Sequence, residues 1–142
     1  FLSEILSKIL THQEKDYELY DFIEESIFYY DKSFFNPNFH LVFLINLSKF
    51  LGFYPDIENN HCKYFDLQHG LYSNIKGSKY VLEGDELKLF NMILGTNFDI
   101  SNELIITSMQ RKKLLDNIIL YYNLHIENFK VVKSLEVLRK LF

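Results

Sequence analysis

The stretch "FHLVFLINLSKF", residues 39–50, is apolar on nearly every side when its residues are placed around a helix. A helix of this kind is buried, because none of its faces is suited to water. Gly52 follows at a position where a left-handed residue commonly ends a helix, and Pro55 stands shortly after it. The stretch therefore predicts a central helix from Phe39 to Leu51 that the rest of the chain covers.

Two helices are expected before this stretch. Apolar residues at helical spacing over residues 1–10 predict an amphipathic opening helix. Asp16 is the expected N-cap of a second helix, because its carboxylate can accept from the free N–H groups of the first turn. The core-facing stripe predicted for this second helix is Leu19, Ile23, Ile27 and Tyr30.

Three helices are expected in the second half of the chain. The first ends at Gly95, the second begins at a capping box formed by Thr107 and Gln110, and the last follows Ser134. Their predicted apolar stripes are Leu87, Phe90 and Leu94; Leu114, Ile118, Tyr122 and Ile126, with Leu115 and Ile119 beside them; and Leu135, Leu138 and Phe142.

Residues 56–82 have a different character. Gly70, Gly77 and the alternating stretch "KYFDLQHGLYS" predict a short β-hairpin with a loop. The predicted fold is therefore mainly α: a helical bundle around a central apolar helix, with a small β-hairpin insertion at about residues 56–82.

Length and composition fit one domain. The chain has 142 residues, of which 48% are apolar, and this is too apolar for a disordered chain. Cys62 is the single cysteine, so no internal disulfide can form, and a reducing, cytoplasmic setting is expected. The longest apolar run, residues 39–47, is far shorter than the roughly 20 residues that span a bilayer, so no membrane span is expected. The chain begins at Phe1 without a methionine and is interpreted as a piece of a longer protein.

Charge is unevenly distributed along the chain. Residues 1–31 carry two lysines against eight carboxylates, a net charge of −6, whereas residues 101–142 carry seven cations against four carboxylates, a net charge of +3. This asymmetry favours either a side that faces a polyanion or simply two solvated faces.

The insertion holds the residues that could be mistaken for a metal site. His61 and Cys62 are adjacent, Asp66 and His69 follow, and no Cys-x-x-Cys pair occurs in the sequence. A closed zinc site needs four donors, usually in two closely spaced pairs. Neither a metal nor a cofactor is therefore expected, and His40 and His125 are interpreted as structural histidines.

The motifs of common catalytic sites are absent from the sequence. It has no glycine-rich phosphate loop, no nucleophile elbow and no His-Glu-x-x-His. Glu24 and Glu25 are adjacent and diverge on a helix surface, and Asp85 and Glu86 fall at a helix start, where carboxylates are stabilised. The chain is therefore not expected to be an enzyme.

Three stretches taken together resemble the RecO family of DNA repair proteins. "FHLVFLINLSKFLGFYPDI" resembles its central helix and the following turn, and "YFDLQHGLYS" resembles the next segment. "LLDNIILYYNLHIENFKVVKSLEVLRKLF" resembles its C-terminal end, where a Lys-Ser pair begins the last helix. The similarity covers nearly the whole chain and is greatest to RecO proteins of the Bacteroidetes type.

The resemblance implies that residues 1–142 are a RecO-like C-terminal helical domain and that an N-terminal OB-fold domain lies outside this chain. Many relatives carry two Cys-x-x-Cys pairs that hold zinc in the insertion. Here Cys62 falls near the first pair, and Ser73 stands where a later cysteine could be. The insertion therefore resembles a zinc ribbon that has lost its metal, and its packing is expected to depend on Tyr64, Phe65, Leu67, Leu71 and Tyr72.

The function implied by the resemblance is recombination mediation in DNA repair, without catalysis. The implied partners are single- and double-stranded DNA, RecR, and the acidic tail of the single-stranded-DNA-binding protein. Phosphates are bound by cations, so the candidate DNA- or partner-binding residues are those of the two basic clusters. They are Arg111, Lys112, Lys113, Lys130, Lys133, Arg139 and Lys140.

An acidic tail that ends in apolar residues needs an apolar pocket with a cation at its rim. The basic, aromatic-rich C-terminus suggests that Phe and Tyr of the C-terminal helices line this pocket and that Lys130, Lys133 or Arg139 pairs with the carboxylate. Two alternatives remain for the function: a helical protein-interaction module without a nucleic-acid role, and a helical domain that binds a small ligand.

Overall fold

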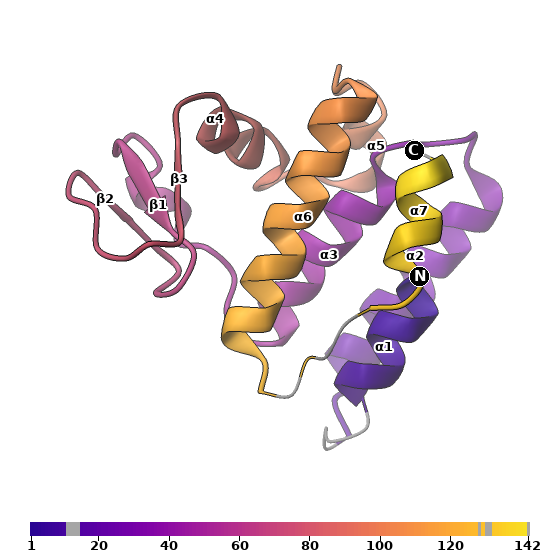
Figure 1. The fold of residues 1–142 in the computed structure, drawn as a ribbon. Coiled ribbons are helices and arrows are strands. Elements are labelled where there is room, and N and C mark those ends of the chain that lie inside the picture. The colour runs from indigo at the N-terminus through magenta and orange to yellow at the C-terminus, as the bar shows by residue number, and fades with distance from the viewer. Residues whose placement is uncertain (11–14, 128, 130–131, 142) are drawn as a thin grey trace.

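The structure of the chain is a computed structural model that describes residues 1–10, 15–127, 129 and 132–141. The predicted mainly α fold is confirmed. The helices are α1 (Leu2–Leu10), α2 (Tyr17–Lys32), α3 (Phe39–Phe50), α4 (Gly84–Ile93), the short α5 (Phe98–Ser101), α6 (Ser108–His125) and α7 (Leu135–Leu141), and residues Ile57–Asn59 form a 3-10 turn, η1. Figure 1 shows a helical body on one side and a small sheet beside it.

Helix α3 is the centre of the helical body, as the sequence predicts. Nine of its twelve residues are buried, and the neighbouring elements α2, α4, α5 and α6 all contact it. Gly52 adopts φ +80° just beyond its end, which only glycine does at little cost. Seven buried apolar residues of the core belong to this helix, and their burial stabilises the fold.

The predicted helix starts are present in the structure. Asp16 accepts a hydrogen bond from the Leu19 N–H at 3.0 Å and caps α2. Thr107 and Gln110 form the capping box of α6, with the Gln110 N–H 3.2 Å from Thr107 Oγ1 and the Thr107 N–H 2.9 Å from Gln110 Oε1. These caps satisfy N–H groups that have no partner within the helix.

The stripe predicted for α2 is wrong at its second half. Leu19 is buried, but Ile27 and Tyr30 are each 58% exposed. The inner face is completed by Phe22, which stacks on Phe43 and Phe50, and by Tyr29. Aromatic residues occur on both sides of α2, so spacing alone did not identify the core-facing side.

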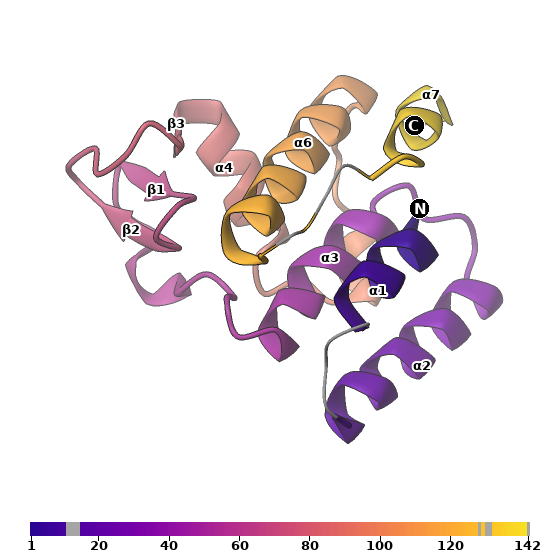
Figure 2. The same cartoon turned by 60° about the horizontal axis from the view of Figure 1, so that its bottom comes forward.

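The insertion contains three strands, one more than the predicted hairpin. Strands β1 (Tyr64–Asp66), β2 (Leu71–Ser73) and β3 (Val81–Glu83) form an antiparallel sheet in the order β2-β1-β3. Phe65 and Leu67 are buried as expected and Tyr64 and Tyr72 partly so, whereas Leu71 is exposed. Figures 1 and 2 show the sheet and α2 at opposite ends of the molecule.

Over the residues that the structure describes, helix α7 is less buried than the sequence predicts. Leu135 and Leu138 pack against the core while remaining partly exposed, and Phe142 lies outside the described residues. Figure 1 shows α7 beside α6, with the first residues of α1 close to its start.

Candidate functional site

The three consecutive cations at the start of α6 point in different directions. Successive residues on a helix are rotated by about 100°. Arg111 turns back, and its Nη1 donates a hydrogen bond to the Ile106 carbonyl, whereas Lys113 reaches toward α4. Lys112 shares a helix face with Asp116, which follows it by four residues. The cluster is therefore a fan rather than a single basic stripe, as the sequence predicts.

Lys113 is paired within the protein. Its Nζ lies 2.7 Å from Glu86 Oε1 of α4, and the Asn117 side-chain amide donates to Glu86 Oε2 at 3.2 Å. The hydrogen bond from Lys113 lowers the pKa of Glu86, against the opposing effect of burial, and Asn117 lowers it further. Lys113 and Glu86 thus hold α4 against α6, which leaves Lys113 less able to bind an outside phosphate.

Arg111 is half-buried next to a buried histidine. Its Nε has no hydrogen-bond partner among the residues that the structure describes. Burial, and after it the charge of Arg111, lowers the pKa of His40 to about 4. His40 is therefore neutral at neutral pH and belongs to the interior, as the sequence analysis predicts.

Arg139 connects α7 to α6. Its Nε donates to Asp116 Oδ1 of α6 at 3.1 Å, and its Nη1 donates to Glu136 Oε1 of its own helix at 2.8 Å. The hydrogen bonds that Arg139 donates to Asp116 and Glu136 raise its pKa above the ordinary value. Arg139 thus fixes α7 on α6, and two carboxylates already surround its charge.

Three of the seven predicted cations remain available for outside contacts. Lys112, Lys133 and Lys140 are exposed, and within the described ranges no ion pair engages them. Lys112 and Lys140 belong to the two helices that Arg139 and Asp116 join, and Lys133 precedes α7. Lys130 lies outside the described residues.

A contact between the two ends of the chain, for which no local sequence signal exists, holds the start of α7. Glu4 of α1 accepts from the backbone N–H groups of Lys133 at 2.8 Å and Ser134 at 2.9 Å. Hydrogen bonds from the Ser134 side chain and from these two N–H groups lower the pKa of Glu4 to about 2. The carboxylate therefore serves as a cap for α7 that comes from the other end of the chain.

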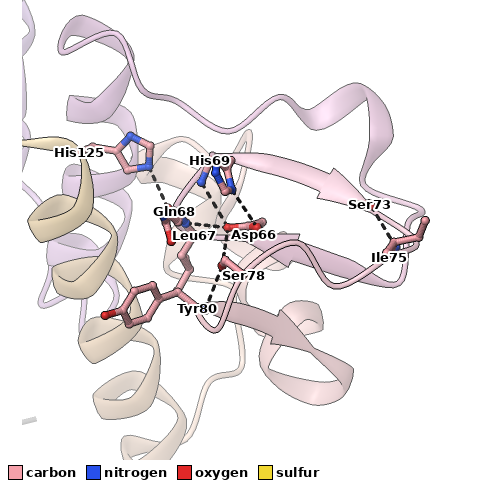
Figure 3. A network of polar contacts seen from close by, with 9 residues as sticks. All are labelled: Asp66, Leu67, Gln68, His69, Ser73, Ile75, Ser78, Tyr80 and His125. Carbon is pink, nitrogen blue, oxygen red and sulfur yellow. Dashed lines mark hydrogen bonds and ion pairs between the residues drawn. The ribbon is translucent and has the colours of Figure 1, made fainter.

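The polar loop of the insertion is organised around Asp66, as Figure 3 shows. Asp66 Oδ1 accepts from the Gln68 N–H at 2.9 Å and from Ser78 Oγ at 2.9 Å, and Oδ2 lies 3.0 Å from His69 Nδ1. Burial by itself raises the pKa of Asp66, but these hydrogen bonds outweigh it and the pKa is lowered. Asp66 thus joins the end of β1 to the β2–β3 connection.

The same loop is attached to the helical body. His125 Nε2, at the end of α6, is hydrogen-bonded to the Leu67 carbonyl at 2.9 Å (Figure 3). Gly70 adopts φ +69° and lies so close to α6 that a Cβ there would be 2.9 Å from the Tyr121 hydroxyl oxygen. The sheet is therefore held against α6 by polar contacts and close packing.

The donor set around Cys62 does not form a metal site in the described parts of the chain. No group of three or more His, Cys, Asp and Glu side chains is arranged there to hold an ion. Asp66 uses its oxygens for hydrogen bonds within the loop, and Cys62 is a partly buried free thiol.

An apolar cavity of about 400 Å³ lies between α1, α2 and α3. Leu138 is the contribution of α7, so this cavity is not built from the C-terminal helices where the sequence analysis placed a pocket. Its position could not be found from charge, because its walls, within the described residues, are mostly apolar and carry no acidic or lysine side chain. They include Phe1, Leu2, Leu6, Ile27, Tyr30, Phe35, Phe39, His40 and Phe43.

Within the described part of the chain, no helix is both long enough and apolar enough to cross a membrane.

Comparison with known proteins places this arrangement in a family. Residues 1–135 match the family model described as "Recombination protein O C terminal". The whole chain aligns with proteins named DNA repair protein RecO from Flavobacterium psychrophilum (37% identity), Christiangramia forsetii (34%) and Bacteroides fragilis (31%). It covers 59% of the length of the first two and 60% of the third.

No solved structure matches the chain. The family match extends from α1 to the start of α7 and so includes the central helix, the sheet and the Asp66 loop. On this basis the chain belongs to the Recombination protein O C-terminal family.

Proposed function

We propose that this chain is the helical part of a recombination mediator that acts in DNA repair, and that it works by binding rather than by catalysis. The observation that carries the proposal is the full-length alignment with proteins named DNA repair protein RecO. The chain spans about three-fifths of those relatives, which leaves room for the OB-fold domain that the resemblance implies. Action on chromosomal DNA would place the protein in the cytoplasm.

The DNA contact that we propose uses the lysines that form no ion pair within the described part of the chain. Lys112, Lys133 and Lys140 are exposed on or beside α6 and α7, whereas Lys113 and Arg139 are held by carboxylates. A lysine that neutralises a phosphate releases a condensed counterion, so each such contact contributes to the salt dependence of binding. Lys130 is part of the same proposal on sequence grounds alone.

The test is the salt dependence of DNA binding. Fluorescence anisotropy with a labelled single strand and a labelled duplex gives the slope of log K against log salt for the wild type and for the triple variant Lys112→Ala, Lys133→Ala, Lys140→Ala. Three lost phosphate contacts should reduce the slope by about 2 to 3. The matched control is Lys79→Ala, Lys88→Ala, Lys15→Ala, which removes equal charge elsewhere. Equal loss in the two triple variants would refute the placement.

Single- and double-stranded DNA, RecR and the acidic tail of the single-stranded-DNA-binding protein are the proposed partners. The acidic end of such a tail would pair with Lys133 or Lys140, which are exposed beside and on α7. Titration of a labelled tail peptide against Lys133→Ala with Lys140→Ala, and against Lys79→Ala with Lys88→Ala as the control, tests this placement. Equal affinities for the two double variants would refute it.

We further propose that the insertion is a zinc ribbon that has lost its metal, and that hydrogen bonds to Asp66 join its two loops instead. The support is the set of hydrogen bonds from Gln68, His69 and Ser78 to one carboxylate. Chelation with EDTA should then leave the unfolding midpoint unchanged, while Asp66→Ala should lower it. A midpoint that falls with EDTA and is restored by zinc would contradict this reading.

A further inference from the structure

Helix α2 has apolar side chains on the face opposite to the core. Its inner face packs on α3 through Leu19 and Phe22. Large apolar side chains on its outer side and just beyond its end are between 58% and 93% exposed. Single exposed apolar residues are ordinary, but a contiguous group usually marks a contact surface. We call this group the outer face of α2: Tyr17, Tyr20, Ile27, Phe28, Phe34 and Phe35.

The outer face includes a shallow groove. Tyr20, Ile27 and Phe28 recur at helical spacing and line a shallow depression together with Glu24 and Asp31. Toward the end of α2, the same surface continues into the cavity of about 400 Å³, whose walls include Ile27, Tyr30 and Phe35. An apolar track therefore runs along α2 into a concave site.

Carboxylates lie along this track. Helix α2 carries five carboxylates and one lysine, a net charge of −4, and in the described part of the chain no ion pair neutralises any of those carboxylates. Lys32 Nζ lies 3.8 Å from the centre of the Phe28 ring, so a ring of the outer face already accepts a cation. The carboxylates are Glu18, Asp21, Glu24, Glu25 and Asp31.

The apolar groove and the negative charge of α2 together favour one class of binding partner. DNA and anionic lipid surfaces are repelled by the net charge of −4, and a second copy would place carboxylates against carboxylates. A basic amphipathic helix complements both properties, because its apolar side chains fill the groove and its Lys or Arg side chains meet the carboxylates and the ring faces. Arg or Lys over Tyr20 and Phe28 would repeat the geometry of Lys32.

We propose that the outer face of α2 docks a basic amphipathic segment of another protein. This site is distinct from the proposed DNA contact, which lies on α6 and α7. Both sites can therefore be occupied at once, and the two proposals can fail separately.

The experiment uses two labelled synthetic helices of about five turns with one leucine pattern, one with lysine and one with glutamate at the polar positions. Anisotropy with the full chain should show saturable binding of the lysine peptide, weakened by salt, and no binding of its glutamate twin. Tyr20→Ser with Ile27→Ser should weaken binding at least about tenfold, and so should Glu24→Lys with Asp31→Lys.

Matched controls remove equal apolar area or reverse equal charge away from α2. Ile105→Ser with Met109→Ser and Glu58→Lys with Glu127→Lys should leave peptide affinity unchanged, because all four side chains are exposed on other elements. The α2 variants should also leave the salt dependence of DNA binding unchanged, which separates this proposal from the DNA contact.

Three results would overturn the proposal. Equal binding of both peptides would show that charge does not select the occupant. Dimerisation in sedimentation velocity that the Tyr20→Ser, Ile27→Ser variant abolishes would assign the face to a second copy. If peptide binding is lost when this chain is part of a longer polypeptide, the outer face of α2 belongs to an intramolecular contact.

Discussion

Arg139 of α7 donates to the Asp116 carboxylate of α6, with Nε 3.1 Å from Oδ1, and this contact joins the helices that carry Lys112 and Lys140. The sequence predicted that Arg139 belongs to the binding surface. In the structure, Arg139 mainly positions the helices that carry Lys112 and Lys140. Arg139 is a third exposed and Asp116 about half, so water screens the pair.

Arg139→Gln should therefore change global stability little, by less than about 1 kcal/mol in the free energy of unfolding from urea denaturation. Its effect should instead be local, with faster amide hydrogen exchange in α7 while α3 and α6 keep the wild-type rates. A loss of several kcal/mol would show that the pair is a core interaction.

The central position of α3 predicts a large cost for truncating its side chains. Leu44 and Leu47 are fully buried, so Leu44→Ala or Leu47→Ala should lower the free energy of unfolding by roughly 2 to 5 kcal/mol, from lost burial and the cavity left behind. Ile105→Ala is the matched control, because that side chain is 92% exposed. If all three variants unfold at the wild-type urea midpoint, α3 is not the centre of the core.

Asp66 predicts an acid-sensitive insertion. Its pKa is lowered in the folded state, so its stabilising effect is present above its unfolded value, near 4, and is lost as the pH falls through the lower folded value. Urea midpoints measured from pH 7 downward should fall more steeply for the wild type than for Asp66→Asn. Parallel pH profiles for the two proteins would rule out Asp66 as a source of this dependence.

Glu4 predicts a second acid-sensitive contact, at lower pH. Its folded pKa is about 2, below its unfolded value of 4.5, so its effect on α7 is present above about 4.5 and is lost as the pH falls toward 2. Glu4→Gln should speed amide exchange at Lys133 and Ser134 at pH 7, and Glu103→Gln is an exposed control. Unchanged exchange at both amides would contradict the capping role.

Alanine substitutions at two glycines with similar φ angles distinguish the stability cost of backbone strain from that of a steric clash. Gly70 and Gly52 both have positive φ, but a Cβ at Gly70 would be 2.9 Å from the Tyr121 hydroxyl oxygen, whereas one at Gly52 meets nothing within 4 Å. Gly52→Ala should cost about 1 to 2 kcal/mol of stability from backbone strain alone. Gly70→Ala should cost more, because Tyr121 must also move. Equal losses of stability for the two variants would mean that the Tyr121 side chain moves away from the new Cβ at no cost.

The sequence was sufficient where one property determined the structure. The all-round apolar character of residues 39–50 identified the buried helix, and Asp16 and Thr107 marked two helix starts by hydrogen bonds that are local in the chain. These features depend on neighbours within a few residues, which spacing and residue type reveal.

The sequence was insufficient where the outcome depended on distant partners. Ile27 and Tyr30 fit the spacing of α2 as well as Phe22 does, and only the position of α3 decides which side is covered. The capping of α7 by Glu4 joins residues about 130 positions apart. The ion pairs of Lys113 and Arg139 likewise depend on carboxylates from other elements, so a count of cations overestimated the free basic surface.

The most direct test of the functional account compares two neighbouring lysines. Lys112→Ala and Lys113→Ala remove the same charge from adjacent positions, but Lys113 is paired with Glu86 at 2.7 Å. We expect Lys112→Ala to reduce the slope of log K against log salt for single-stranded DNA by about 0.7, and Lys113→Ala to change it far less. Equal effects of the two substitutions, or DNA binding that neither alters, would contradict the account.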